Sequence, residues 1–274
     1  MTVRDSVGDT GTWTFDAIPH SKPDGARETW NQGGGLHNIP RYCIWLKDVS
    51  PAKYNSSKEI MARLTKIKKF RSVSDRTATL RYAQFPSLFV EIRQPDTDYI
   101  IIPRHSSENR QYIPIGFLDK NIIAGDANSF IPNATLYEFG IITSTMHMAW
   151  MRYVCGRIKS DYRYSNTIVY NNFPWPSPTE KQKQIIMEKA QGVLEARKKF
   201  PELSLADLYN TTSMLPELVK AHQKLDKAVE ITYGRTFTDD SQRVAFLFEL
   251  YQKLLGELFV GGKRKSAPSR SVDE

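Results

Sequence analysis

The sequence has 274 residues, of which 40% are hydrophobic, and a formal net charge of +8 at pH 7. These values exclude a mostly disordered chain and favour an anionic partner, nucleic acid ahead of a membrane surface. No apolar run approaches the roughly 20 residues that span a bilayer, and the N-terminus lacks the apolar core of a signal peptide. Only Cys43 and Cys155 are cysteines, which suits a reducing, cytoplasmic location, and the scattered histidines predict no metal site.

The first part of the chain is predicted to be irregular. Residues 1–40 are rich in Gly, Pro, Asp and Asn, and their "QGGG" run has neither the predicted strand before it nor the long helix after it that a nucleotide loop needs. A short apolar strand is expected at 41–46. Residues 56–70 have apolar side chains at helical spacing and predict an amphipathic helix.

The positive charge is concentrated near this helix. Residues 41–81 contain eleven Lys or Arg and three Asp or Glu, an excess of eight that equals the net charge of the whole chain. We expect a single basic face that could hold phosphate groups. The alternative is a solvated helix surface without a partner.

The middle of the chain mixes strand and helix signals. Apolar, β-branched runs predict strands at 87–92, 99–103, 113–118, 121–125 and 167–173, with a tight turn at Asp119–Asn121 between the third and the fourth. Residues 135–158 predict a buried helix with a polar end. The prolines at 174, 176 and 178 are expected to end this domain.

The last third of the chain is predicted to be helical. Ser177 to Glu180 has the form of a capping box for a helix that runs to about Lys199. Further helices are expected at 216–233 and from Thr238 or Asp239 to about Phe259. The predicted fold class is α+β, with a mixed α/β domain at 41–176, a small antiparallel helical bundle at 177–262 and a disordered tail at 263–274.

No catalytic motif is found in the sequence. There is no GxSxG motif and no phosphate-binding GxxxxGK[ST] loop. The "NNFPWP" segment superficially resembles the Asn-Pro-Pro-aromatic loop of amino-methyltransferases, but its residues are in the wrong order and no glycine-rich donor loop precedes it. We therefore assign no catalytic residue to this chain.

Two blocks carry a resemblance to a known family. "MHMAWMRYVCGRIKSDYRYSNTIVYNNFPWP" (146–176) closely resembles a block near the C-terminus of MmeI-like enzymes, which are DNA adenine-N6 methyltransferases, many of them fused to a restriction nuclease. "RYCIWLKDVSP" (41–51) resembles the start of their target recognition domain. The resemblance covers about 41–262 and implies a target recognition domain followed by a C-terminal helical domain.

The resemblance also implies partners and a cofactor outside this sequence. The methyltransferase and nuclease motifs of the family are absent here, so we expect the specificity portion of a restriction-modification enzyme, working with catalytic domains on the same or a separate chain. Duplex DNA is the expected partner. S-adenosylmethionine is expected in the missing methyltransferase domain, and no cofactor is expected in this chain.

Three residues are candidates for base reading. If the segment is extended, Lys159 and Asp161 point the same way, so that the lysine can donate to guanine O6 or N7 while the carboxylate accepts from cytosine N4. The resemblance implies that this pair selects a G:C base pair and that Arg163 also influences base choice. The alternative is that Lys159 and Asp161 pair with each other on a surface turn.

A second set of residues is predicted to contact the DNA backbone: Arg63, Lys66, Lys68, Lys69, Arg71, Arg76, Arg81, Arg157 and Asn166. The aromatic residues after the candidate pair, among them Tyr164, Phe173 and Trp175, are expected to pack the domains rather than stack on bases. His147 is expected to be a core histidine. The rival function is a protein-interaction module with an incidental basic surface.

Overall fold

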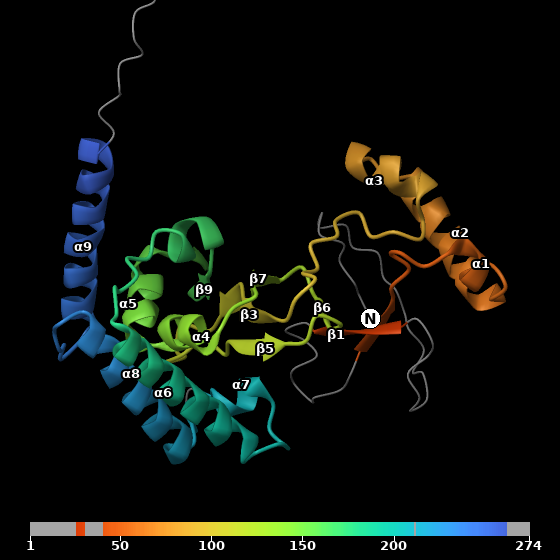
Figure 1. Ribbon diagram of the computed structural model, residues 1–274. Helices are drawn as coiled ribbons and strands as arrows, with labels where there is room; N and C mark the ends of the chain where they lie inside the picture. The colour runs from red at the N-terminus through yellow and green to blue at the C-terminus, as the bar shows by residue number, and fades with distance from the viewer. Residues whose placement is uncertain (1–25, 31–40, 211, 262–274) are drawn as a thin grey trace, which may run out of the picture. The chain divides into compact units, whose positions relative to one another are not determined.

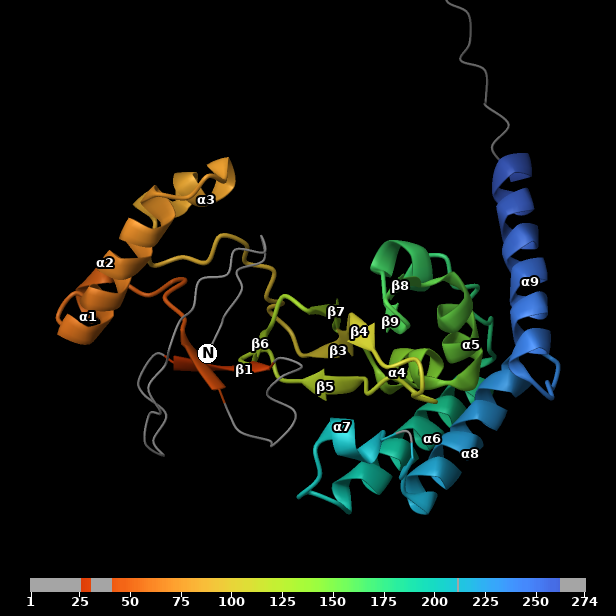
Figure 2. The same ribbon diagram turned by 180° about the vertical axis from the view of Figure 1, so that it is seen from behind.

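The computed structural model describes the backbone of residues 26–30, 41–210 and 212–261, and the side chains of residues 43–210 and 212–257. The chain divides into two compact units (Figures 1 and 2). The first contains Met1–Pro103, Pro114–Ala134 and Glu202–Asp207, and the second contains Arg104–Ile113, Thr135–Pro201 and Leu208–Glu274. Both units are therefore assembled from segments that alternate along the sequence.

The first unit begins with a strand that the sequence analysis missed. β1 (Ala26–Trp30) pairs antiparallel with β2 (Arg41–Ile44) and parallel with β6 (Ile123–Ala124). The expectation of an irregular segment at 1–40 is thus wrong for 26–30, and the rest of that segment lies outside the described residues. The "QGGG" run itself lies outside the described residues, and the described elements before and after it, β1 and β2, are both strands.

The second sheet of this unit has the order β5-β3-β7 and is antiparallel. Its strands are β3 (Tyr99–Pro103), β5 (Gly116–Leu118) and β7 (Asn128–Pro132). Tyr99 to Ile102 are almost fully buried because β3 is the central strand and both of its faces are covered. The predicted strands at 99–103 and, in part, at 113–118 and 121–125 are confirmed, although β5 and β6 join different sheets.

The basic region forms short helices. They are α1 (Pro51–Tyr54), α2 (Lys58–Ser72), α3 (Thr77–Arg81) and the 3-10 turn η2 (Tyr82–Gln84). The predicted helix at 56–70 is confirmed, and the Ser57 side chain caps it by accepting from the backbone N–H of Ile60. The predicted strand at 87–92 is wrong: the segment is irregular, and the Leu88 carbonyl accepts from Arg71 instead of from a neighbouring strand.

The second unit is mainly helical. Its helices are α4 (Leu136–Thr143), α5 (Thr145–Val154), α6 (Glu180–Lys198), α8 (Pro216–Thr232) and α9 (Asp240–Gly261), while the short α7 (Leu205–Leu208) ends at its border. In both views α6 and α8 lie side by side, and α6 also packs on α4 while α5 packs on α9. The α+β class is therefore confirmed. No helix of the described segments is both long and apolar enough to cross a membrane.

Two details of these helices differ from the predictions. The predicted helix at 135–158 is interrupted at Ser144, whose φ of −75° and ψ of 159° are extended and whose hydroxyl donates to the Ile141 carbonyl at 2.7 Å. This bond helps to end α4, and the same hydroxyl oxygen accepts from the backbone N–H of His147 at 3.5 Å and so caps α5. The capping box of α6 is formed by Thr179 and Gln182, two residues later than predicted.

A third, small sheet belongs to the second unit. β9 (Asp161–Arg163) is its central strand, between β8 (Gly156–Ile158) and β4 (His105–Ser106), and both pairings are antiparallel. The predicted strand at 167–173 is wrong. Residues Asn166–Tyr170 form the π-helical turn η3, whose Val169 carbonyl accepts from the buried indole of Trp150 at 3.0 Å.

Candidate nucleic-acid interface

The candidate base-reading residues lie on the β8–β9 hairpin. Ile158 and Asp161 are paired residues, so Lys159 and Ser160 form a two-residue turn. Lys159 has a φ of 54°, a left-handed conformation that glycine or asparagine adopts more easily. The expectation that Lys159 and Asp161 project together from an extended strand is therefore wrong, because the lysine is at the tip of the turn and the aspartate begins the next strand.

The alternation argument does hold along β9. Asp161 and Arg163 are exposed, whereas Tyr162 between them is 6% exposed. Residues two apart on a strand share a face, so the carboxylate and the guanidinium project from the same side of the sheet. Among the described residues no ion pair joins Lys159 to Asp161. All three side chains of Lys159, Asp161 and Arg163 are thus presented to solvent.

Arg157 stabilises the hairpin from within. Its Nη1 donates to the Ser160 carbonyl at 2.7 Å, and its guanidinium lies 4.2 Å from the ring centroid of Tyr162. The same nitrogen is 3.9 Å from a carboxylate oxygen of Glu108. These contacts close the turn that carries Lys159. A contact from the half-exposed Arg157 to DNA phosphate stays a prediction.

The sequence analysis missed the residues that surround Asp161. Oδ1 of Asp161 accepts from the backbone N–H of Glu108 at 3.3 Å, across 53 positions of the chain. Burial lowers the pKa of the nearby Arg110, and the charge of Asp161 acts in the opposite direction. No local pattern connects these segments, because only the pairing of β4 with β9 brings them together.

The aromatic residues after the hairpin form the interior of the second unit. Tyr164 is buried, and its hydroxyl lies 2.9 Å from Nε2 of the fully buried His147. The ring of His147 packs edge-on against Phe173, which in turn packs against Trp175. Burial lowers the pKa of His147 to about 3, so the imidazole is neutral. The prediction of a core histidine is confirmed. The aromatic rings pack inside one unit, and their role in packing two domains together stays a prediction.

The amide side chains of this region differ in their roles. Nδ2 of Asn172 donates to the carbonyls of Thr167 and Ile168 at 3.0 and 3.2 Å and so fixes the π-helical turn. Asn166, the first residue of that turn, is exposed. Its side chain is therefore accessible, and its predicted contact with DNA phosphate stays a prediction.

The basic helix of the first unit exposes most of its candidate residues. Lys66, Lys68 and Lys69 on α2, and Arg76 and Arg81 beside it, are exposed, while Arg63 is half-buried. The five exposed side chains can approach an anionic polymer without desolvation of a buried charge. This surface belongs to a different unit from the hairpin.

Arg71 does not belong to that surface. It is 8% exposed, and its guanidinium donates to the carbonyls of Tyr82, Phe85 and Leu88 at 3.2, 3.0 and 2.9 Å. These bonds tie α2 to the segment that follows η2 and use the donors that would bind phosphate. The assignment of Arg71 to the DNA backbone is corrected for this reason.

The described residues contain no cluster of three or more His, Cys, Asp and Glu side chains that could hold a metal ion. The hairpin supplies groups for hydrogen bonding and charge pairing. It offers an ammonium group, a carboxylate and a guanidinium on one short exposed element, the donor and acceptor types that distinguish base pairs in the major groove.

Comparison with known proteins identifies the class. Residues 27–177 match the family model described as "MmeI, target recognition domain", and residues 178–259 match "MmeI, C-terminal domain". The chain therefore belongs to the MmeI family, as a target recognition domain followed by a C-terminal domain.

Two relatives can be named. The chain is 37% identical over 222 residues to "DNA methyltransferase A" of Bacillus subtilis (strain 168), which covers 81% of this chain and 25% of that protein. It is also similar to the structure of the Type IIL restriction-modification enzyme MmeI in complex with DNA, with 45% identity, a TM-score of 0.82 and coverage of 85% of this chain and 31% of that one. The chain thus spans about a quarter to a third of these relatives.

Proposed function

We propose that this chain reads the sequence of duplex DNA as the specificity portion of an adenine-N6 DNA methyltransferase or restriction-modification enzyme. The observation that carries the proposal is the β8–β9 hairpin, which presents Lys159, Asp161 and Arg163 to solvent in a chain of the MmeI family. The similarity to a structure of MmeI in complex with DNA supports it further.

The chemistry of the three side chains suits direct reading of base edges. An ammonium group donates to the O6 and N7 acceptors of guanine, and a carboxylate accepts from N4 of cytosine. Since a carboxylate is repelled by DNA phosphates, Asp161 lowers affinity wherever it does not meet a base donor. This favours a base with an exocyclic amino donor, such as cytosine, over guanine and thymine. Arg163 can form a bidentate contact with a guanine nearby.

The exposed lysines and arginines of α2 and α3 supply sequence-independent affinity in this proposal. Each phosphate contact releases condensed counterions, so binding weakens as salt increases. Lys66, Lys68 and Lys69 are exposed on one helix and are the principal candidates. Arg63, Arg76, Arg81, Arg157 and Asn166 complete the proposed backbone set.

Catalysis is assigned to domains outside this chain. We propose that a methyltransferase domain, with a nuclease domain in fused enzymes, acts on the bound DNA and holds S-adenosylmethionine. The described strands of this chain are not followed by a glycine-rich loop and a helix, the arrangement that binds such a donor. We also propose a cytoplasmic location, because genomic DNA is the proposed substrate.

A binding selection tests the proposal. The chain is incubated with random duplex DNA at moderate salt, and the bound sequences are compared between the wild type and the double variant Lys159→Glu, Asp161→Arg. We expect a motif with a G:C pair that becomes C:G in the double variant. The matched control is Lys198→Glu, Glu195→Lys, which reverses an exposed ion pair on α6 and should leave the motif unchanged.

Other outcomes separate the alternatives. An unchanged motif in the double variant would remove Lys159 and Asp161 from base reading and leave DNA recognition in place. Binding without any motif, whether or not it depends on salt, would contradict the proposal and favour a protein-interaction module.

A further inference from the structure

A tight turn lies directly beside the strand that carries Asp161. The segment Ser107–Arg110, named here the brace turn, follows β4 and is closed by a hydrogen bond from the Arg110 N–H to the Ser107 carbonyl at 3.1 Å. β4 pairs with β9, so that His105 lies opposite Arg163 and Ser106 opposite Tyr162. The brace turn is therefore fixed in register with the candidate base-reading strand.

The brace turn contacts two charged side chains of the hairpin. The backbone N–H of Glu108 donates to Oδ1 of Asp161 at 3.3 Å, and the Glu108 carboxylate lies 3.9 Å from Arg157. Arg110 is half-buried, and the negative charge of Asp161 acts on its guanidinium. A carboxylate with a backbone donor on one side and an arginine charge nearby is restricted to fewer rotamers.

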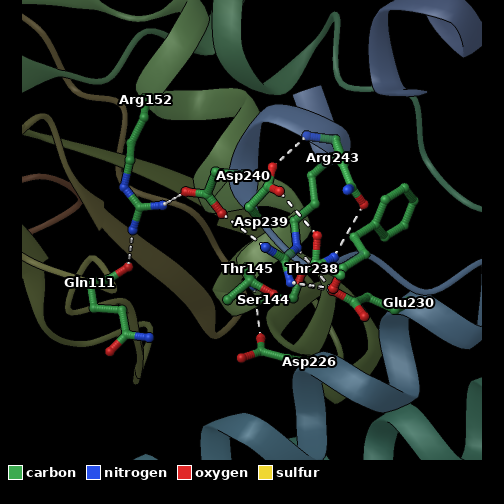
Figure 3. A network of polar contacts seen from close by, with 12 residues as sticks. Gln111, Ser144, Thr145, Arg152, Asp226, Glu230, Thr238, Asp239, Asp240 and Arg243 are labelled. Carbon is green, nitrogen blue, oxygen red and sulfur yellow. Dashed lines mark hydrogen bonds and ion pairs between the residues drawn. The ribbon is translucent and has the colours of Figure 1, made fainter. Parts of the chain in front are cut away.

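The other end of the same segment is held by the helices. The hydroxyl of Tyr112 donates to Oδ2 of Asp226 on α8 at 2.7 Å, and the Tyr112 ring stacks on His222 with centroids 4.0 Å apart. Arg152 on α5 donates both to the Gln111 carbonyl and, at 2.7 Å, to Asp240 on α9, as Figure 3 shows. The segment thus links three helices to the hairpin.

We propose that the brace turn is a specificity-determining element, in which Glu108 and Arg110 are positioning residues that aim the Asp161 carboxylate at its base pair. This inference rests on the proposed function. The positive charge of Arg110 acts on Asp161 and so also offsets part of the repulsion between its carboxylate and DNA phosphates. Neither residue needs to touch a base for this role.

The first test is Arg110→Gln in the full chain. The measured quantity is the ratio of the affinity for the selected duplex to that for a duplex with the G:C pair reversed at the position that depends on Asp161. We expect the ratio to fall by about fivefold, because Asp161 loses the favourable charge of Arg110. Arg110→Lys should restore part of it. The control, Arg235→Gln, removes an exposed arginine that stacks on Phe237 and Phe246 and should leave the ratio unchanged.

A double-mutant cycle with Asp161→Asn shows whether Arg110 acts through Asp161. If it does, the second substitution adds little to the first. Additive losses would mean that Arg110 meets the DNA directly, which would overturn the positioning role. A wild-type motif that survives Arg110→Gln unchanged would overturn the inference while the proposed function stands. A wild type without any motif would overturn the proposed function itself.

A second variant keeps the inference testable if Arg110→Gln does not fold. Glu108→Ala removes an exposed carboxylate and its contact with Arg157 but retains the backbone N–H that binds Asp161. We expect a smaller fall in the same ratio, about threefold, as is common for an exposed ion pair. No fall in a folded Glu108→Ala variant would remove Glu108 from the proposal.

Discussion

The hydroxyl of Tyr112 donates a hydrogen bond to Oδ2 of Asp226 at 2.7 Å, across 114 positions of the chain. The other carboxylate oxygen accepts from the backbone N–H of Thr145, also at 2.7 Å. Burial nevertheless raises the pKa of Asp226 to about 6, from an ordinary value of 3.8, because these two bonds only partly compensate for the lost hydration. Asp226 therefore connects α8 and α5 with the segment that leads to the brace turn. The free-energy cost of burying its negative charge depends on pH.

The first prediction concerns Asp226→Asn. The folded state binds the Asp226 proton more tightly than the unfolded state, so this stabilisation is complete below pH 3.8 and is lost as pH rises through 6. A shift of this size corresponds to about 3 kcal/mol in the free energy of unfolding. Asparagine can still accept from Thr145 and donate to Tyr112 but does not titrate.

The measurement is chemical unfolding of both proteins between pH 4 and 7. The stability of the wild type relative to Asp226→Asn should fall by about 2–2.5 kcal/mol over this range, most of the full effect. Burial lowers the pKa of His147 and His222, which makes both the wild type and the variant less stable in acid. The effect of the two histidines cancels in the difference between the two proteins, so that this difference reports on Asp226 alone. Two parallel curves would show that Asp226 does not titrate in this range.

The second prediction concerns the strained turn of the hairpin. Lys159 has a φ of 54°, where glycine avoids a cost of about 1 kcal/mol or more. We expect Lys159→Gly to increase the free energy of unfolding by about that amount and to abolish the preference for the G:C pair. Lys159→Ala serves as the control, since it also removes the ammonium group but retains the strain. Equal stability of the two variants would contradict the strain argument.

The third prediction separates Arg71 from its exposed neighbours. Arg71→Met removes three hydrogen bonds to backbone carbonyls and should lower the free energy of unfolding by about 2–4 kcal/mol, without changing the salt dependence of DNA binding. Lys66→Ala should leave the free energy of unfolding unchanged. It should reduce the slope of log binding constant against log salt concentration by about one. Binding titrations at several salt concentrations and thermal unfolding check both. A reduced salt slope for a folded Arg71→Met variant would return Arg71 to the DNA surface.

The fourth prediction concerns the crossing of α4 and α6. A Cβ atom on Gly140 would lie 2.7 Å from Cγ2 of Ile186 and 3.3 Å from the Cβ of Ala190. We expect Gly140→Ala to lower the free energy of unfolding by about 1–3 kcal/mol, because the extra methyl group overpacks a buried helix contact. Adding Ile186→Ala should cost less in this background than in the wild type, which urea unfolding of the four proteins measures. Additive effects on the free energy of unfolding would mean that α4 and α6 move apart at little energetic cost.

Periodic patterns in the sequence predicted the helices well and the site only in part. The helices α2 and α8 bury one face each, and α9 buries Leu247, so their apolar spacing is visible locally. The run at 167–173 has β-branched residues for another reason: Val169 is buried in a π-helical turn, and its backbone carbonyl accepts a hydrogen bond from Trp150. Propensity alone could not distinguish these uses, because tertiary packing decides them.

The hairpin illustrates the same limit at the level of function. The residue types at 159, 161 and 163 indicated base reading, but the two-residue turn that places Lys159 at a tip was hidden, since lysine is not a typical residue for a left-handed turn. The contact between Glu108 and Asp161 depends on strand pairing over 53 positions and leaves no local signal.

The alternation of segments between the two units has a consequence for synthesis on the ribosome. The first unit needs Glu202–Asp207, and the second needs Arg104–Ile113 as well as the C-terminal helices, so neither can complete its packing until most of the chain has emerged. Contacts that are distant in sequence delay folding, because a long loop must close before they form. A truncated chain that stopped near residue 177 would leave Tyr112 without Asp226. We expect nascent chains of that length to expose apolar surface and to bind chaperones.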